Sequence, residues 1–476
     1  MRRRVKQGLS SLRVHCCAVA LAASACFASA GANAEHHWQV PESGVIGVDD
    51  AQLAPEYWIS RTHDADRVIF DAAAIAERNA RLLHVDPSMH DLRALPSTLS
   101  RSAVAGWIEK LSARPTRQLF DVAGKPVPGE RIDALMAALN LSAIPESAPA
   151  RYGLVVHRAA LRSFPTELRV FSRSGDTDID RFQETALFPG TPVVIAHESA
   201  DKQWWFVVSE RYAAWVDKKA IAEGGAEQVF GYGERHPYRI VTGSAVASVF
   251  TPEQPALSAL HLDMSARVPL LPDWPAAKEV NGQHPYTSYV IDLPLRGDDG
   301  MLRFAPALVQ KNADTRSDYL PLTRANILRQ AFKFLGERYG WGHSYEGRDC
   351  SGFVSDVYRS MGVLMPRNTR DQSISPGLDH RAFGSADEKA ARLAAVHELD
   401  VGDLVYIPGH VMMSIGSVDG EPYVIHDTGG VSYRREDGTR AHVDLNEVAV
   451  SPLTPLLLSD DETYVDRMTS IVRVRP

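Results

Sequence analysis

The spacing of apolar residues changes three times along this chain, and those changes decide which folds it can adopt. Before residue 149 the apolar residues recur at helical spacing, for example over residues 68–83. From Arg151 to about residue 318 they form short runs with a two-residue period, separated by Gly, Pro and Asp. Helical spacing returns from Leu322 and recurs over residues 351–361, and the two-residue period resumes after Asp400. The last change, from helices to an antiparallel sheet, predicts an α+β domain at the C-terminal end.

These changes divide the chain into a multidomain arrangement. Short, evenly spaced strands are typical of small barrels and not of a parallel sheet, so the middle of the chain predicts two small all-β barrels. A mostly helical segment precedes the barrels, and the α+β domain follows them. The predicted parts are a signal peptide at 1–34, the helical segment at 35–148, all-β domains at 149–225 and 235–318, and the C-terminal domain at 322–476.

The first 34 residues have the three parts of an export signal. A basic start is followed by an apolar core and then by small residues, with Ala28-Ser29-Ala30 and Ala32-Asn33-Ala34 both fitting the cleavage pattern. The apolar run is short for a membrane anchor. We therefore expect cleavage and export, to the periplasm or cell envelope. Cys26 ends a weaker lipoprotein-like pattern, which leaves lipidation as an alternative.

Removal of that segment makes the chain strongly acidic. Five basic residues and no acid are lost, so the formal net charge falls from −8 to −13. Such a charge disfavours nucleic acid and other polyanions as partners. No second apolar stretch approaches the length of a membrane-spanning helix. We therefore expect no membrane span in the mature chain, and we expect a monomer.

Cleavage after Ala34 leaves Cys350 as the one cysteine of the exported chain, so no internal disulfide can form. The phrase Arg348-Asp349-Cys350-Ser351-Gly352-Phe353 places this thiol where a loop enters a predicted helix. The free N–H groups and the dipole of a helix start favour thiolate, lower its pKa and can hold an oxyanion. Cys350 is therefore a candidate nucleophile. The alternative is an inert buried thiol beside a helix-capping Asp349.

A nucleophilic thiol needs a base, and two histidines at predicted strand ends are candidates. His410 opens a strand and His426 ends the next one. The connection Val418-Asp419-Gly420 fits a three-residue hairpin loop, which would pair Ser417 with Glu421 and place both histidines on one face. A two-residue turn would instead send them to opposite faces of the sheet.

Four phrases around these residues resemble the NlpC-type cell-wall cysteine peptidases of papain-like fold. They are Asp349-Cys350-Ser351-Gly352-Phe353, Leu399-Asp400-Val401-Gly402-Asp403-Leu404, Gly409-His410-Val411 and Val424-Ile425-His426. The resemblance implies Cys350 as the nucleophile, His410 as the base and His426 as the third, orienting residue. More loosely, it implies that both all-β domains are bacterial SH3-like domains and that residues 35–148 are a stabilising segment.

As a whole, the chain is similar to exported γ-D-glutamyl-L-diamino-acid endopeptidases. That similarity implies a cofactor-free hydrolase acting on peptidoglycan stem peptides or muropeptides, in cell-wall remodelling or muropeptide recycling. It also implies substrate-binding roles for Asp349, Ser351, Asn368, Tyr339 and Tyr212. Three of these matches are imperfect. Asn368 stands where relatives with this specificity carry Asp, and Ala214 replaces the Gly that usually precedes Trp215. Tyr339 stands one residue closer to Cys350 than the matching Tyr of the family.

Two other functions stay open, namely a catalytically inactive wall-binding scaffold and a thiol acyltransferase on the same fold. No metal or cofactor is predicted, because the sequence has no H-E-x-x-H and its histidines lack metal-ligand spacing. Gly342-His343-Ser344-Tyr345-Glu346 misses the serine-hydrolase elbow at its last residue, and Gly231-Tyr232-Gly233 lacks the third glycine of a dinucleotide loop.

Overall fold

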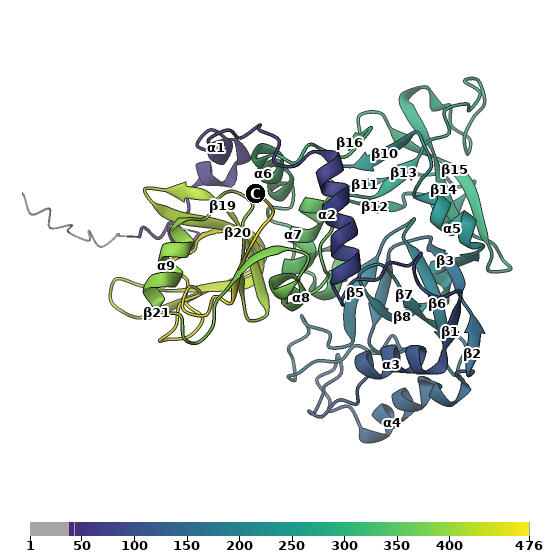
Figure 1. Cartoon of the computed structure of the whole chain (residues 1–476), viewed down its shortest axis with the longest axis horizontal. Helices are drawn as coiled ribbons and strands as arrows, with labels where there is room; N and C mark the ends of the chain where they lie inside the picture. The colour runs from purple at the N-terminus through teal and green to yellow at the C-terminus, as the bar shows by residue number, and fades with distance from the viewer. Residues whose placement is uncertain (1–37, 42, 476) are drawn as a thin grey trace, which may run out of the picture. The chain divides into compact units, whose positions relative to one another are not determined.

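A computed structural model describes residues 38–41 and 43–475 of the chain (Figure 1). The predicted signal peptide at 1–34 lies outside these residues. From Gln39 onwards the chain forms one unit, and the elements below belong to it. In the part of the chain that the structure describes, no helix is both long enough and apolar enough to cross a membrane.

The segment before the first large sheet is mainly helical, as predicted. The helix predicted over 68–83 begins at Ala72, because the Asp71 side chain accepts a hydrogen bond from the Ala74 N–H and caps it. The elements of this segment are η1 (Asp50–Leu53), α1 (Pro55–Ile59), α2 (Ala72–Val85), β1 (Thr98–Ser100), α3 (Arg101–Leu111), α4 (Gly129–Ala138), η2 (Leu141–Ala143) and β2 (Ser147–Pro149). β1 and β2 pair in antiparallel orientation.

The helical segment packs on the rest of the chain at several points. Trp58 of α1 is 1% exposed, and its ring packs on Tyr423 near the C-terminal end of the sequence. Arg78 of α2 forms an ion pair with Asp379. These contacts make the segment part of the folded protein and not a separate tail.

Residues 151–224 form an antiparallel seven-stranded sheet in the order β5-β4-β8-β7-β6-β3-β9. Both faces are covered, with Trp215 and Phe206 in one apolar cluster and Trp205 and Val207 in the other. The predicted all-β class is confirmed, but no ladder joins β5 to β9, so closure into a barrel is not detected. The strands are β3 (Arg151–Val155), β4 (Ala159–Arg162), β5 (Gln183–Leu187), β6 (Pro192–Glu198), β7 (Trp204–Val208), β8 (Ala213–Asp217) and β9 (Ile221–Gly224), with η3 (Lys218–Ala220) before β9.

Residues 235–318 are also rich in strands, which form three small sheets in the orders β13-β10-β16, β11-β12 and β14-β15. Side chains from these sheets share one core that includes Val241, Leu262, Ile291 and Val309. The elements are α5 (Ala226–Tyr232), β10 (Tyr238–Val241), β11 (Ala245–Ala247), η4 (Pro255–Leu257), β12 (His261–Asp263), β13 (Arg267–Pro269), η5 (Pro285–Thr287), β14 (Ser288–Arg296), β15 (Leu302–Gln310) and β16 (Thr315–Arg316). The assignment of 235–318 as a second SH3-like domain stays a prediction.

The C-terminal part has the predicted α+β character. Its antiparallel sheet has the order β17-β22-β18-β19-β20-β21, and α7 packs against β19 and β20 (Figure 1). The elements are α6 (Arg324–Phe332), η6 (Trp341–Glu346), α7 (Cys350–Arg359), α8 (Thr369–Ile374), β17 (Asp379–Ala382), α9 (Lys389–His397), β18 (Leu404–Ile407), β19 (His410–Val418), β20 (Glu421–Arg434), β21 (Arg440–Pro452) and β22 (Ser470–Arg473).

The turn between β19 and β20 differs from its predicted form. Val418 pairs with Glu421, so Asp419 and Gly420 form a two-residue turn. Both turn residues have positive φ, of 50° and 85°. Two-residue turns of this kind match the right-handed twist of the paired strands, which explains why the predicted three-residue loop is wrong.

A β-bulge restores the register that the histidines need. The pairing shifts between Ser414 and Gly416, which inserts one extra residue into β19. Beyond the bulge Met413 pairs with Ile425, which is the register that a three-residue loop would have produced. The two histidines therefore share a face, although the turn alone would have separated them.

Two glycine substitutions should change the stability of the protein in opposite directions, one at the bulge and one in a helix away from it. Gly416 has φ +124°, a conformation that L side chains rarely adopt, so Gly416→Ala should destabilise the protein by about 1–3 kcal/mol. Gly106 lies inside α3 with open space where a Cβ would stand, so Gly106→Ala should stabilise it by about 0.5–1 kcal/mol. Urea unfolding of both variants measures the difference. A Gly416→Ala variant as stable as the wild type would contradict this account of the bulge.

Candidate active site

Cys350 begins α7 and lies against the start of β19. Its side chain is almost fully buried, and its Sγ lies 4.0 Å from the carbonyl oxygen of Gly409. The backbone N–H of Val411 also bonds to this sulfur. The sulfur therefore contacts the backbone on both sides of His410, and the helix start and the strand start meet at this point.

The two histidines form a hydrogen-bonded chain that ends in a hydroxyl. His410 Nε2 lies 2.8 Å from His426 Nδ1, and His426 Nε2 lies 3.1 Å from Ser451 Oγ on β21. His426 is fully buried and His410 is partly exposed. The structure thus brings together the thiol and the two histidines that the sequence singled out, in the order Cys350, His410 and His426.

Burial sets the protonation of this group. It raises the pKa of the Cys350 thiol to about 12, and the nearby Asp349 carboxylate acts in the same direction. Burial also lowers the pKa of His410 to about 4 and that of His426 well below its usual value. At neutral pH the thiol is protonated and both imidazoles are neutral. The lowered thiol pKa expected from the sequence is wrong, because the loss of solvation outweighs the helix N-terminus.

A neutral resting pair of this kind can still react. Burial penalises a charge on the thiol alone or on His410 alone. Transfer of the thiol proton to the imidazole instead creates two opposite charges at once, and these attract strongly where water is excluded. The arrangement therefore favours proton transfer coupled to attack by sulfur, and not a permanent thiolate.

A buried guanidinium holds the start of α7. Arg367 donates to Asp349 Oδ1 at 3.1 Å, to Asp349 Oδ2 at 2.8 Å and to Ser351 Oγ at 2.9 Å. Asp349 in turn accepts the Gly352 N–H at 2.8 Å and caps the helix. Asp349 and Ser351, which the sequence assigned to substrate binding, are therefore buried and hydrogen-bonded within the protein. They fix the start of α7, the helix that begins with Cys350.

Arg367 also lies near two polar residues of the seven-stranded region, Glu184 of β5 and Tyr212, which precedes β8. The Tyr212 hydroxyl donates to Glu184 Oε2 at 2.5 Å. Burial and Glu184 raise the pKa of Tyr212, while neighbouring Arg367 and Asn368 lower it. The Asn368 side chain does not cap α8 and donates instead to Asp371 at 3.0 Å. Tyr212, Glu184 and Asn368 thus come from separate segments and lie around one position.

Two further titratable residues, Tyr339 and Asp427, lie near Cys350. Burial, followed by the neighbouring thiol, raises the pKa of Tyr339. Asp427 follows His426 in β20, is fully buried, and has no hydrogen-bond partner for either carboxyl oxygen among the described residues. Burial raises the pKa of Asp427 well above its usual value, which favours its neutral form. Asp427 was not among the candidate site residues predicted from the sequence. Its position in an otherwise apolar strand, directly after His426, could have indicated a buried carboxyl group near the site.

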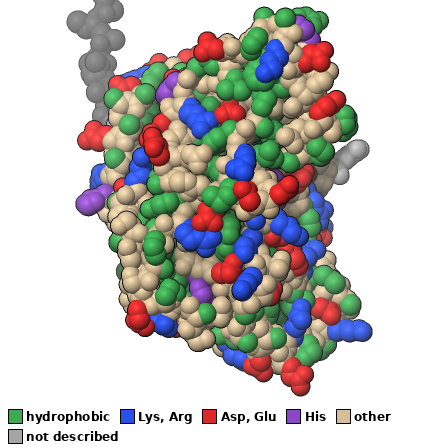
Figure 2. Space-filling model, turned by 90° about the vertical axis from the view of Figure 1, so that its right-hand side faces the viewer, with side chains coloured by type: hydrophobic (Ala, Val, Ile, Leu, Met, Phe, Trp, Pro, Cys, Tyr) green, Lys and Arg blue, Asp and Glu red, His purple; other side chains and the backbone are tan. Residues whose placement is uncertain are grey.

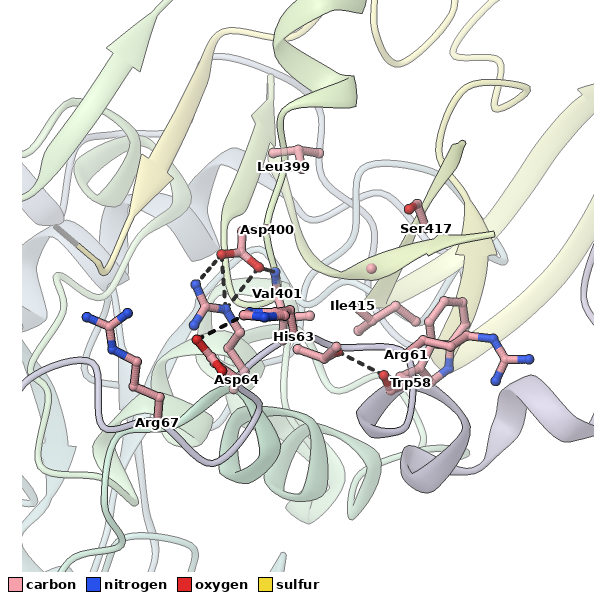
Figure 3. Close-up of a pocket in the computed structure, with 13 residues that line it drawn as sticks. Trp58, Arg61, His63, Asp64, Arg67, Leu399, Asp400, Val401, Ile415 and Ser417 are labelled. Carbon is pink, nitrogen blue, oxygen red and sulfur yellow. Dashed lines mark hydrogen bonds and ion pairs between the residues drawn. The ribbon is translucent and has the colours of Figure 1, made fainter. Parts of the chain in front are cut away.

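The pocket in Figure 3 lies away from this group of residues. It is bounded by Trp58 of α1 and by Ser417, at the opposite end of β19 from His410. Its Asp400 carboxylate is already paired with Arg324, and its lining includes no thiol. Within residues 38–475, as far as the structure describes them, no group of three His, Cys, Asp or Glu side chains could hold a metal ion.

One face of the molecule is shown with its charges in Figure 2. Acidic and basic side chains are interspersed over this face, with hydrophobic side chains between them. Nucleic-acid-binding surfaces instead gather basic side chains into a continuous patch or stripe. This face carries no such continuous patch.

The thiol's protonation predicts a distinctive alkylation profile. At neutral pH Cys350 should react with iodoacetamide more slowly than an exposed thiol, because burial keeps it protonated. Its rate should rise about tenfold per pH unit and should not level off near pH about 8.5, where an ordinary thiol ionises. Peptide-mapping mass spectrometry measures both rates in a Ser385→Cys variant, whose added thiol lies at an exposed position. Fast alkylation with a plateau below neutral pH would reveal a resting thiolate and contradict this account.

Comparisons with known proteins identify two domain families in this chain. Residues 336–447 match the model of the NlpC/P60 family, and residues 169–217 match that of an SH3 domain of the SH3b1 type. A solved NlpC/P60 endopeptidase from Photobacterium damselae subsp. piscicida has a similar fold, with a TM-score of 0.68 at 16% identity. That match covers 86% of this chain and 94% of the other.

Two curated relatives match shorter stretches. The chain is 27% identical over 168 residues to a γ-D-glutamyl-L-lysine dipeptidyl-peptidase of Bacillus cereus, covering 34% of this chain and 44% of the relative. It is 30% identical over 94 residues to dipeptidyl-peptidase 6 of Lysinibacillus sphaericus, covering 20% and 30% respectively. The chain thus spans less than half the length of these relatives. Together, the fold and the family matches identify an SH3 domain of the SH3b type followed by a C-terminal domain of the NlpC/P60 family.

Proposed function

We propose that this protein is an exported cysteine peptidase that hydrolyses the γ-D-glutamyl–diamino acid amide bond of peptidoglycan stem peptides. The observation that carries the proposal is that the Cys350 sulfur contacts the backbone on both sides of His410, whose ring is hydrogen-bonded to His426. A thiol, a base and an orienting group in that order are the machinery of cysteine-dependent acyl transfer. The bond class is supported by the relative named γ-D-glutamyl-L-lysine dipeptidyl-peptidase.

The hydrogen-bond chain suits His410 Nδ1 as the base in one tautomer. In the tautomer that we propose, His426 Nε2–H donates to Ser451 Oγ and His426 Nδ1 is an acceptor. His410 then donates its Nε2–H to that nitrogen, so His410 Nδ1 carries the free lone pair. His410 Nδ1 is therefore the atom that takes the proton from the Cys350 thiol, and His426 holds the imidazole in the required tautomer.

The reaction then runs in two halves. The Cys350 sulfur attacks the γ-carbonyl carbon of D-glutamate as its proton passes to His410, and the C–N bond breaks when His410 returns that proton to the leaving amine. Water, deprotonated by His410, then cleaves the thioester and restores the thiol. Free N–H groups at the start of α7 stabilise the oxyanion in both halves. Half-buried Tyr339 lies near the thiol, in a position to border the substrate.

We further infer that the site binds a stem peptide whose first amine is free. A buried ammonium needs a nearby anion, because desolvating an unpaired charge is costly. Asn368 supplies no charge, whereas Glu184 of the SH3 domain supplies a carboxylate already hydrogen-bonded to Tyr212. Burial raises the pKa of Glu184, and a bound ammonium would lower it again.

The central test is digestion of defined muropeptides with products weighed by mass spectrometry. Wild type should release the γ-D-glutamyl product, whereas Cys350→Ala should lose essentially all activity, about 10⁴-fold or more, because no other nucleophile is available. His426→Ala should keep a small residual rate. Digestion by Cys350→Ala at the wild-type rate would contradict the proposal and favour a scaffold. Products that carry an added amine acceptor in place of water would favour an acyltransferase.

The amine site makes a separate prediction. Wild type should cleave L-Ala-γ-D-Glu-diamino acid at least about tenfold better than its N-acetylated form, since acetylation removes the ammonium. The Glu184→Gln variant should lose that preference. Adding Asn368→Asp to this variant should restore part of the preference, because the new aspartate supplies a carboxylate. Glu223→Gln is the matched control, because Glu223 pairs with Arg151 elsewhere in the same sheet. Equal cleavage of both peptides by wild type would contradict free-amine binding while leaving the peptidase proposal intact.

A further inference from the structure

A buried chain of charged groups connects three parts of the molecule ahead of Cys350. Asp263 of β12 is fully buried, and its Oδ1 accepts from Arg158 Nη1 at 2.6 Å and from Arg348 Nη2 at 3.1 Å. His261 Nε2 lies 3.4 Å from the same oxygen. Arg158 lies between β3 and β4 of the seven-stranded sheet, and Arg348 lies two residues before the start of α7. One carboxylate thus bridges the seven-stranded sheet and the C-terminal domain.

Arg158 also holds the loop that leads into α7. Its two terminal nitrogens donate to the backbone carbonyls of Glu346 at 3.1 Å, His343 at 3.0 Å and Gly347 at 2.7 Å. His343, Tyr345 and Glu346 have φ of 62°, 59° and 59°. This left-handed conformation is strained for L side chains and persists only where the surroundings impose it. The Arg158 contacts impose it here.

Arg348 completes the connection from the peptidase side. Its side chain is almost fully buried and donates to Asp356 of α7 at 2.8 Å and to Glu337 at 2.9 Å. It also donates to the backbone carbonyl of Ser244 at 3.0 Å, a second contact with the strand-rich 235–318 region. Because Arg348 stands two residues before the nucleophile, its position fixes the path of the backbone into the helix.

We propose that Asp263 is a positioning residue for Cys350, acting from outside the peptidase domain. Its one carboxylate bridges two guanidinium groups, of which Arg158 holds the strained loop and Arg348 holds the entry to α7. Without that charge Arg158 loses its carboxylate partner and lies beside the Arg348 cation, which keeps Asp356 and Glu337. The loop then relaxes, and the sulfur moves relative to His410. The catalytic consequence rests on the proposed peptidase function; the effect on the loop does not.

The inference gives the 235–318 region a role in catalysis. Contacts that hold a reacting group in place need not touch the substrate, because a displacement of about 1 Å can lower a rate roughly 100-fold. Asp263 and Ser244 belong to this region and contact the residue two positions before the nucleophile. The region therefore supports the reaction as well as any wall contact it makes.

The experiment compares Asp263→Asn with Asp292→Asn in the whole mature protein. Asp263→Asn keeps the shape of the side chain and removes its charge. Asp292 is the matched control, because it is a mostly buried carboxylate of the same region and pairs with Arg235 at 2.6 Å. For the stem tripeptide, Asp263→Asn should lower kcat roughly 10- to 100-fold with KM within about twofold. Asp292→Asn should keep kcat within about twofold of wild type at a comparable loss of stability.

Loop behaviour is measured without reference to peptidase activity. Amide hydrogen exchange over residues 341–349 should be faster in Asp263→Asn than in Asp292→Asn, and the alkylation profile of Cys350 should change in the first variant alone. Arg158→Lys is the second variant if Asp263→Asn does not fold, since lysine keeps the charge and loses the planar fork of donors. It should stay folded with faster loop exchange and lower kcat.

The outcomes separate the two proposals. Wild-type kcat and wild-type loop exchange in Asp263→Asn or Arg158→Lys would overturn the positioning role. Equal losses of kcat in Asp263→Asn and Asp292→Asn, in proportion to lost stability, would also overturn it. Faster loop exchange in Asp263→Asn, found in a protein whose wild type cleaves no stem peptide, would support the positioning role while the proposed function fails.

Discussion

The ion pair between Asp349 and Arg367 is the contact on which the active site depends. Asp349 binds the guanidinium through both oxygens, caps α7 through the Gly352 N–H, and accepts the Gly342 N–H at 3.1 Å. Removing one partner of a buried pair of this kind costs about 3–5 kcal/mol, because the other charge is left unpaired. Arg367 Nε also contacts Thr185 of β5 at 2.5 Å. The SH3 domain and the NlpC/P60 domain therefore meet at α7, the helix that begins with Cys350.

The same burial explains the chemistry of the site. Solvent is excluded from the start of α7, which raises the pKa of Cys350 and lowers those of His410 and His426. Charge then forms on the thiol and the imidazole only as an opposite pair, when a carbonyl is there to be attacked. A buried, protonated thiol of this kind reacts slowly with electrophiles and oxidants from solution.

Several features of the site could be predicted from the sequence because they depend on local spacing. The start of α7 at Cys350 follows from a capping residue before an amphipathic run, and strand alternation places His410 and His426 at equivalent positions. The turn between the strands could not be predicted, since Asp419-Gly420 is compatible with loops of two and of three residues. The β-bulge that corrects the register is marked in the sequence by Gly416 alone, whose positive φ favours glycine.

The remaining features depend on residues that are far apart in the sequence. Asp263 is 85 residues from Arg348, and Thr185 is 182 residues from Arg367, so no local pattern relates them. The raised pKa of Cys350 also depends on residues far apart in the sequence. Its place at a helix start was visible, but its burial is a property of the assembled fold.

Trapping the acyl-enzyme tests the central claim most directly. The full mature protein is mixed with L-Ala-γ-D-Glu-diamino acid, quenched in acid within one turnover, and mapped by peptide mass spectrometry. The account predicts that the L-Ala-D-Glu acyl group is found on the peptide that contains Cys350, that it disappears at the rate of product release, and that Cys350→Ala lacks it. Product formation with no acyl group on that peptide, or with the group on another residue, would contradict the account.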